Sequence, residues 1–452
     1  MNSKFTEGSI IRPLVGFAIP VLFAMVLQTL YGVVDLLVVG RFGTTADVSG
    51  VSTGSMVTHT ITNVVTGLAM GITVIIGQSI GEKNKEKANQ AIGSGIFLFI
   101  IFTALMTLLV AGGASWIANW LDTPAEAYAH TVSYIRICGL GYVFVVAFNV
   151  IGSIFRGIGD GKTPLMTVAI ACGFNVALDM LLVAVFGMGA SGAALATIFA
   201  QGISVVLSLI VIGKRSLPFE FSLKLVRFNR QMCASELKLG IPISLQDVLT
   251  SISFLIVQTV VNSMGVVASA GVGIGEKISI FLMLVPLACM QAMSAFVAQN
   301  IGADKEDRAK KALGLGIGFS LLIGIVMAYL SFAQGGILAG IFTTDQRVIA
   351  ATQEYLKAYA VECFLTSFVF SFMGFYNGCG KTMFVMVQGL VGAFCVRTPL
   401  VLWLGSREDT TLFQIGLATP AATAMQLILC LFFFVLFFIK IKDVKNDWGK
   451  IL

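Results

Sequence analysis

Four polar side chains interrupt the apolar first half of the chain at spacings that suit an ion-binding site. They are two carboxylates, an amide and a hydroxyl: Asp35, Asp179, Asn175 and Thr197. Counted at about 1.5 Å per helical residue, Asp35 lies about 9 Å, and Asp179 and Thr197 about 12 Å, below one membrane surface. Asn175 shares a helix face with Asp179, one turn away. Oxygen ligands at one depth indicate a cation or proton site; the alternative is a hydrogen-bonded polar plug.

The second half holds a different set of ionisable residues, which form a candidate carboxy-lobe polar site. Glu362 and Arg397 fall in the outer half of their apolar stretches, so we expect Glu362 to pair with Arg397 or Lys277, in a structural or a functional role. Glu276 adjoins Lys277 and predicts a local pair. Asp247 lies about 13 Å from the opposite surface, too far to pair with Glu362.

The elements that position these residues are membrane spans. Apolar residues make up 57% of the 452-residue chain and charged residues 12%, and the mean hydropathy is +0.93. A soluble domain carries roughly a quarter charged residues. Apolar stretches of about 20 residues cross a bilayer as helices. We predict an all-α membrane protein of about twelve spans: 14–40, 49–77, 90–118, 130–153, 164–186, 190–212, 239–263, 270–297, 311–334, 351–376, 383–405 and 411–438.

The placement of Lys and Arg predicts the orientation. If the amino terminus is cytoplasmic, 22 of the 29 basic residues fall in cytoplasmic segments. Only four fall outside (Arg41, Arg347, Lys357 and Arg407) and three lie within spans (Arg136, Lys277 and Arg397). Both termini are therefore predicted to be cytoplasmic. The net charge of +6 follows from this bias and does not indicate nucleic-acid binding.

The chain reads as two copies of one unit. Pro20 returns as Pro242, and Gln78–Gly81 returns as Gln299–Gly302, at a nearly constant offset of 221 to 222 residues. Each copy holds six predicted spans, so the copies are parallel repeats, a design in which one bundle rocks against the other. We expect an amino-terminal lobe at 1–213, a basic cytoplasmic linker at 214–238 and a carboxy-terminal lobe at 239–452.

Other classes of protein are not favoured by the sequence. The eight cysteines are scattered, and suggest neither a disulfide framework nor a metal site beyond Na⁺ at Asp35 and Asp179. Gly161-Lys162-Thr163 ends like a phosphate-binding loop, but Arg156 stands where that motif needs its first glycine. No catalytic grouping or filter-like repeat indicates an enzyme or a channel. We therefore expect no enzymatic activity and no cofactor.

With these features, the chain resembles the multidrug and toxic compound extrusion family over essentially its whole length. The resemblance rests on the two Gly-x-Pro openings, the two Gln-to-Gly turns and Arg156–Asp160. It extends to the family's amino-lobe cation site through Tyr31–Asp35, Asn175–Asp179 and Gly192–Thr197. One branch of the family also has a Glu and an Asp in the carboxy lobe; here those positions are Thr250 and Thr366, with Asp247 and Glu362 about a turn away.

The resemblance implies a secondary antiporter in the plasma membrane of a prokaryote-type cell. Its substrates are expected to be amphipathic, often cationic, organic compounds, exported in exchange for H⁺ or Na⁺ bound in the amino lobe. We expect it to act as a monomer in the lipid bilayer. The alternative is a flippase for lipid-linked oligosaccharides or other amphipathic lipids, although a pyrophosphate lipid favours more basic residues in the lumen than the three within spans.

Overall fold

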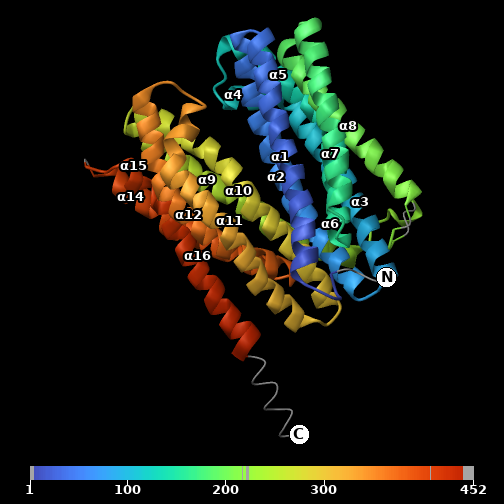
Figure 1. Cartoon of the computed structure of the whole chain (residues 1–452). Coiled ribbons are helices and arrows are strands. Elements are labelled where there is room, and N and C mark those ends of the chain that lie inside the picture. Colours follow the sequence, from blue (N-terminus) through green and yellow to red (C-terminus); the bar gives the residue numbers. More distant parts are fainter. Residues whose placement is uncertain (1–4, 216, 220–222, 408, 441–452) are drawn as a thin grey trace. The chain divides into compact units, whose positions relative to one another are not determined.

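The computed structural model describes residues 5–215, 217–219, 223–407 and 409–440, and within them the chain is helical without strands. The first half contains α1 (Ile11–Phe42), α2 (Thr45–Gly81), α3 (Lys85–Gly112), α4 (Ala114–Trp120), α5 (Ala125–Leu140), α6 (Tyr142–Ile158), α7 (Lys162–Asp179), η1 (Met180–Val185) and α8 (Gly189–Lys214). The second half contains η2 (Leu223–Leu225), α9 (Arg230–Ser263), α10 (Val266–Gly302), α11 (Glu306–Gly340), α12 (Gln346–Gly378), α13 (Thr382–Leu390), η3 (Val391–Arg397), α14 (Thr398–Gly405), α15 (Leu412–Gly416), α16 (Ala418–Phe434) and η4 (Val435–Lys440). Figure 1 labels most of them along the chain.

The predicted membrane spans are confirmed. Eleven helices in the described residues are long and apolar enough to cross a bilayer. A twelfth span is the bent pair α5 and α6, which meet at Gly141 with an angle of 50°. This pair corresponds to the span expected at 130–153, and the sequence analysis did not predict its bend. The ends of the helices follow local signals, as at α2, where Thr44 and Asp47 form a reciprocal capping box.

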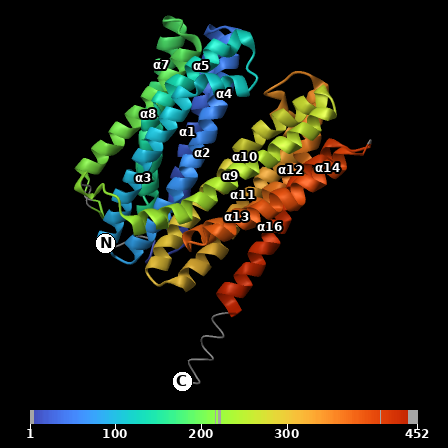
Figure 2. The same ribbon diagram turned by 180° about the vertical axis from the view of Figure 1, so that it is seen from behind.

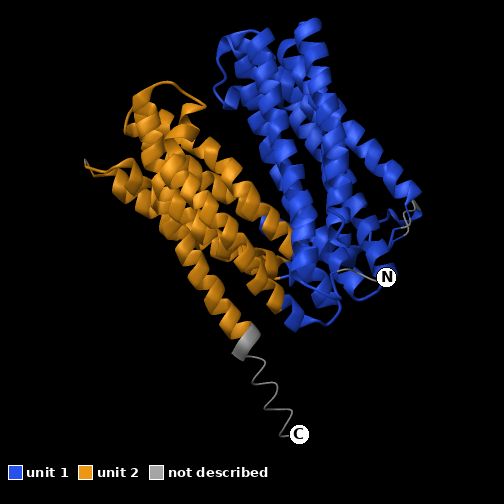
Figure 3. Cartoon of the chain, in the orientation of Figure 1, with its two compact units in different colours: residues 1–244, 294–309, 378–380 blue, residues 245–293, 310–377, 381–452 orange. Residues whose placement is uncertain are grey.

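Two compact units can be distinguished by their contacts (Figure 3). Unit 1 comprises Met1–Ser244, Ser294–Ala309 and Gly378–Gly380, and unit 2 comprises Leu245–Met293, Lys310–Asn377 and Lys381–Leu452. Their boundary falls inside α9, two residues after Pro242. Helix α9 begins at Arg230, within the segment expected to be a linker, and its first turns belong to unit 1. The division into lobes at 213 and 238 stays a prediction.

In unit 1, α1, α7 and α8 pack side by side, as both views of the ribbon show (Figures 1 and 2). A separate apolar cluster joins α2, α3 and α6 around Ile72, Ile76 and Phe99. Unit 2 has its own core, in which Tyr355, Leu356 and Ile415 are almost fully buried. Outside these cores, both units carry many exposed Leu, Ile and Phe side chains, as expected for surfaces that contact lipid.

The end of unit 1 that carries Gln78–Gly81 and Gln299–Gly302 is called the inner end, after the orientation that the sequence predicts. Two repeat-related hydrogen bonds close it: Gln78 Nε2 donates to the carbonyl of Gly378 at 3.2 Å, and Gln299 Nε2 donates to that of Gly157 at 2.8 Å. Beside them, the Arg308 guanidinium donates to the backbone carbonyls of Phe5, Glu7, Gly8 and Ser9. The inner end thus joins segments from both halves of the chain.

Candidate ion-binding site

Three adjacent helices position the four polar residues of the amino-terminal half. Asp35 lies on α1, Asn175 and Asp179 lie on α7, and Thr197 lies on α8. The hydroxyl of Tyr31, one turn before Asp35, donates to the carbonyl of Val168 at 2.8 Å and so ties α1 to α7. The exposed fraction is 2% for Asp35 and 0% for Asn175 and Asp179. The structure therefore brings together, inside one bundle, residues that are up to 162 positions apart.

The Asp35 carboxylate is the centre of the site. Asn175 Nδ2 donates to Asp35 Oδ1 at 3.1 Å, and Thr197 Oγ1 donates to Asp35 Oδ2 at 2.6 Å. Asp179 lies within hydrogen-bonding reach of Asp35. Two carboxylates can form such a bond only if one of them carries a proton. Otherwise a cation must lie between them, since two unneutralised charges at this spacing repel strongly.

Three oxygens of the site have no donor in the described residues. They are both carboxylate oxygens of Asp179 and Oδ1 of Asn175. A buried oxygen without a partner is costly, and its usual explanation is an ion, a proton or an ordered water. Carboxylate, amide and hydroxyl oxygens also form the donor set that hard cations prefer. The arrangement can bind a single proton between the carboxylates or a small cation among the oxygens.

A π-helical segment, η1, follows directly after Asp179. Such segments are rare, and they occur frequently at functional sites because they change the direction of the side chains along a helix. The sequence contains no recognisable signal for η1, nor for η3, the π-helical segment that ends at Arg397 in the other half. Two of the three π-helical segments in the described residues, η1 and η3, therefore adjoin or contain a buried ionisable residue.

The carboxy-lobe set is only partly assembled. Glu362 and Arg397 are 5% and 4% exposed, and Arg397 interacts electrostatically with Glu362 and Glu276. Glu276 Oε1 accepts a hydrogen bond from Tyr355 at 2.6 Å. Asp247 and Lys277 are exposed side chains. The structure thus gathers three of the five predicted residues.

The predicted ion pairs of this set are absent from the structure. In the described residues no nitrogen of Arg397 or Lys277 lies within 4.0 Å of an oxygen of Glu362, and Glu276 forms no such pair with Lys277. The Arg397 guanidinium instead stacks 4.0 Å from the ring centre of Phe254, and Glu362 Oε1 accepts a hydrogen bond from Thr423 at 2.8 Å. Depth along a helix does not determine the direction of a side chain around it, so depth alone could not show that these side chains have other partners in this structure. Pairing of Glu362 with Arg397 or Lys277 in another state of the protein stays a prediction.

Sequence reasoning missed a charged contact at the opposite end of unit 1. Asp47 Oδ1 accepts a hydrogen bond from the backbone N–H of Ala190 at 2.9 Å, and His130 Nδ1 lies 2.7 Å from the same oxygen. The contact joins α2, α5 and α8, and the left-handed Gly189 (φ 53°) makes room for it. The only signal for this contact in the sequence is the capping box of Thr44 and Asp47, which predicts where a helix begins but does not indicate which other residues Asp47 contacts.

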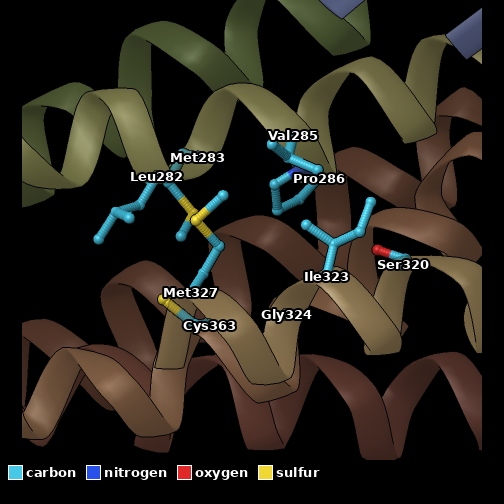
Figure 4. Close-up of a pocket in the computed structure, with 9 residues that line it drawn as sticks. All are labelled: Leu282, Met283, Val285, Pro286, Ser320, Ile323, Gly324, Met327 and Cys363. Atoms are coloured by element: carbon cyan, nitrogen blue, oxygen red, sulfur yellow. The ribbon is translucent and has the colours of Figure 1, made fainter. Parts of the chain in front are cut away.

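A small pocket in unit 2 lies between α10, α11 and α12 (Figure 4). It encloses about 200 Å³, open solvent included. Its wall is apolar apart from the Ser320 hydroxyl, which has no hydrogen-bond partner among the residues that the structure describes. A drug-sized ligand needs a cavity of about 300 Å³ or more. The pocket is therefore too small to define a substrate site; its lining comprises Leu282, Met283, Val285, Pro286, Ser320, Ile323, Gly324, Met327 and Cys363.

Long apolar helices around a buried pair of carboxyl groups are typical of a multi-pass membrane transporter. The MatE family model matches the chain twice, at residues 20–181 and 242–403, in agreement with the predicted repeat that begins at Pro20 and Pro242. The chain belongs to the multidrug and toxic compound extrusion (MATE) family, whose members are transporters rather than enzymes and need no cofactor. The resemblance noted from the sequence is confirmed, as is a location in the bacterial plasma membrane.

Relatives and solved structures agree with this assignment. The probable multidrug resistance protein YpnP of Bacillus subtilis is 27% identical over 89% of this chain and 91% of its own length. The multidrug export protein MepA of Staphylococcus aureus is 24% identical over 86% of each chain. A crystal structure of MATE in the straight conformation has a TM-score of 0.89 at 20% identity, with 98% of each chain covered. A transporter of the MOP superfamily from Pyrococcus furiosus has a TM-score of 0.90 at 19% identity, over 98% of this chain and 100% of its own.

Proposed function

We infer that this transporter exports amphipathic organic compounds, often cationic, in exchange for H⁺ or Na⁺. Several relatives are named as multidrug exporters, and this supports the substrate class. The single observation that carries the coupling is the buried pair Asp35 and Asp179, with three oxygens that lack donors. The chain acts as a monomer, since the coupling site lies within one bundle of one chain.

The two carboxylates have different roles. Asp35 already accepts two hydrogen bonds, from Asn175 and Thr197, which stabilise its ionised form. Asp179 accepts none in the described residues, so it is the group that takes up the proton or offers both oxygens to Na⁺. Binding draws α1 and α7 together, because Asp35 lies on one helix and Asp179 on the other.

Coupling follows from a difference in affinity between two states. An ion shifts the equilibrium between outward-open and inward-open forms only as far as it binds one of them more tightly. A site shared by three helices changes its affinity when one helix shifts, so ion binding and lobe movement are linked. Alternating access of two parallel repeats around a central substrate site is the accompanying movement.

Purified protein in liposomes tests this function. Uptake of a fluorescent organic cation is measured with a pH gradient and a Na⁺ gradient imposed separately, in the wild type, Asp35→Asn and Asp179→Asn. We expect one gradient to drive transport in the wild type and neither to do so in the two variants. Asp247→Asn is the matched control, because it removes a carboxylate from the other half of the chain. Gradient-driven transport at the wild-type rate by Asp35→Asn would overturn the assignment.

A further inference from the structure

Glu236 is a buried carboxylate that lies outside the site described above. It is 3% exposed and lies at the end of the second turn of α9. The helix is amphipathic here. Its buried or half-buried face carries Met232, Cys233, Glu236, Leu239 and Gly240, and its exposed face carries Gln231, Ala234, Ser235, Leu237 and Lys238. Glu236 therefore stands in the middle of the face that packs into the protein.

That face packs on α2 and α3 at backbone distance. A Cβ on Gly71 would lie 2.5 Å from the carbonyl oxygen of Glu236, and one on Gly240 would lie 2.6 Å from that of Leu68, so only glycines allow α2 and α9 to cross here. On α3, a Cβ at Gly95 would lie 3.7 Å from Glu236 Oε1. Met232 and Leu239 pack, one turn to either side, against the apolar cluster of α2, α3 and α6. The carboxyl group is thus inserted into an apolar core.

Neither oxygen of Glu236 has a hydrogen-bond partner in the part of the chain that the structure describes. Helix α2 has no Asp, Glu, Lys or Arg between Asp47 and Glu82, and its one histidine, His59, is twelve residues, about 18 Å, from Gly71. The other titratable groups on the packed elements are Lys85, Glu86 and Lys87 at the start of α3, and Tyr142 and Arg156 at the two ends of α6. On η2 and α9 they are Lys224, Arg230, Cys233, Lys238 and Asp247, all of them exposed except Cys233. None of the basic groups lies within 4.0 Å of Glu236. An ionised carboxylate is costly in such surroundings, which favour the neutral acid.

We propose that Glu236 is a proton-binding site, loaded while the start of α9 packs on α2 and α3 and emptied when this contact opens. The inference rests on the proposed function, because alternating access requires the inner end to open. The inner ends of α9, α10 and α12 all belong to unit 1, and α9 leaves that unit at Ser244, just after Pro242. Proline lacks the N–H that a helix interior needs, so it weakens α9 at this point.

The proton balance defines what the site does. Opening exposes Glu236 to water, and the O–H bond breaks to give a carboxylate and one proton in the solvent at the inner end. Closing takes one proton back from the same side. The cycle moves no net proton across the membrane, so the site does not drive export. It makes the packed state bind one proton more than the open state, and alkaline conditions at the inner end therefore favour opening.

Cys233 supplies a native probe, since it is 3% exposed on the same face of α9, three residues before Glu236. The full-length protein in lipid nanodiscs is treated with a maleimide at a series of pH values, and modification of Cys233 is quantified by peptide mass spectrometry. We expect the labelling rate of the wild type to rise more steeply with pH than that of Glu236→Gln, by at most about tenfold per pH unit for a one-proton linkage. Lys238→Gln is the matched control, because it changes an exposed charge on the same helix and keeps the wild-type profile.

Infrared spectroscopy gives a second readout. The carbonyl band of protonated carboxyl groups should lose intensity in Glu236→Gln, measured at neutral pH without substrate or gradient. An unchanged band, or equal pH profiles of Cys233 labelling in the wild type and Glu236→Gln, overturns the proposal. If Glu236→Gln does not accumulate, Glu236→Leu makes the same test, since an apolar side chain suits the pocket. Asp35→Asn should leave the pH profile of Cys233 labelling unchanged, so failure of the ion-coupling assignment is distinguishable from failure of this one.

Discussion

Replacing Gly81 by alanine tests whether the inner end depends on a backbone crossing of α2 and α10. Gly81 and Gly302 are the last residues of these helices. A Cβ on Gly81 would overlap the carbonyl oxygen of Gln299 and lie 2.8 Å from the nitrogen of Ala303. A Cβ on Gly302 would overlap the carbonyl oxygen of Gln78 in the same way. The obstacles are backbone atoms, which cannot turn aside as a side chain can, so the two helices must separate.

The free-energy cost of Gly81→Ala can be estimated from the contacts that separation of the two helices breaks. Overpacking at a tight contact costs about 1–3 kcal/mol, and a weakened Gln299–Gly157 hydrogen bond adds about 0.5–1.5 kcal/mol. Against this, alanine at an open helical position gains up to about 1 kcal/mol over glycine. A net loss of about 1–3 kcal/mol changes the equilibrium between the packed and separated forms of the inner end by about 5- to 150-fold.

Thiol labelling measures this change without a transport assay. Cys379 lies between Gly378 and Gly380 at the inner end and is half-buried. We expect a maleimide to modify Cys379 about 5- to 150-fold faster in Gly81→Ala than in the wild type, with a lower thermal unfolding midpoint. The control is Gly314→Ala on α11, where no atom lies within 4 Å of the added Cβ. If Gly81→Ala labels and unfolds like the wild type, the crossing does not stabilise the inner end.

Three further predictions concern single sites. Asp179→Asn should abolish gradient-driven export at normal membrane abundance, whereas Asp247→Asn should retain most of it; equal export by both in a whole-cell efflux assay would contradict the site. Arg397→Met should leave thermal stability unchanged or raise it, because an apolar side chain replaces a buried guanidinium whose Nε and Nη1 have no hydrogen-bond partner in the described residues. A stable Arg397→Met protein that has lost export would show that Arg397 acts in transport, and a strongly destabilised one would show a structural partner. Gly189→Ala should cost about 1–3 kcal/mol, since its positive φ is strained for alanine and its Cβ would overlap the Asp47 carboxylate; an unchanged unfolding midpoint would refute this.

Much of the architecture is determined by local properties of the sequence. A bilayer accepts only helices of sufficient length and apolarity, so hydropathy alone identified the spans, including the one that is bent at Gly141. The constant offset between Pro20 and Pro242 showed the repeat, which the family match reproduces. Depth along a helix and the four-residue spacing of Asn175 and Asp179 predicted that these side chains lie near Asp35, as they do, because both depend only on position in the chain. That they bind an ion stays a prediction.

Only the tertiary structure decided which side chains meet. The rotation of each helix about its own axis is determined by packing with its neighbours. The depth of a residue, read from the sequence, therefore could not predict that Arg397 stacks on Phe254 or that Glu362 accepts a hydrogen bond from Thr423. The same holds for Asp47, whose partners His130 and Ala190 come from two other helices. Glu236 stood in a basic segment that reads as a linker. Its burial arises because glycines on α2 and α9 let two backbones touch, a fit that exists only once the helices have packed.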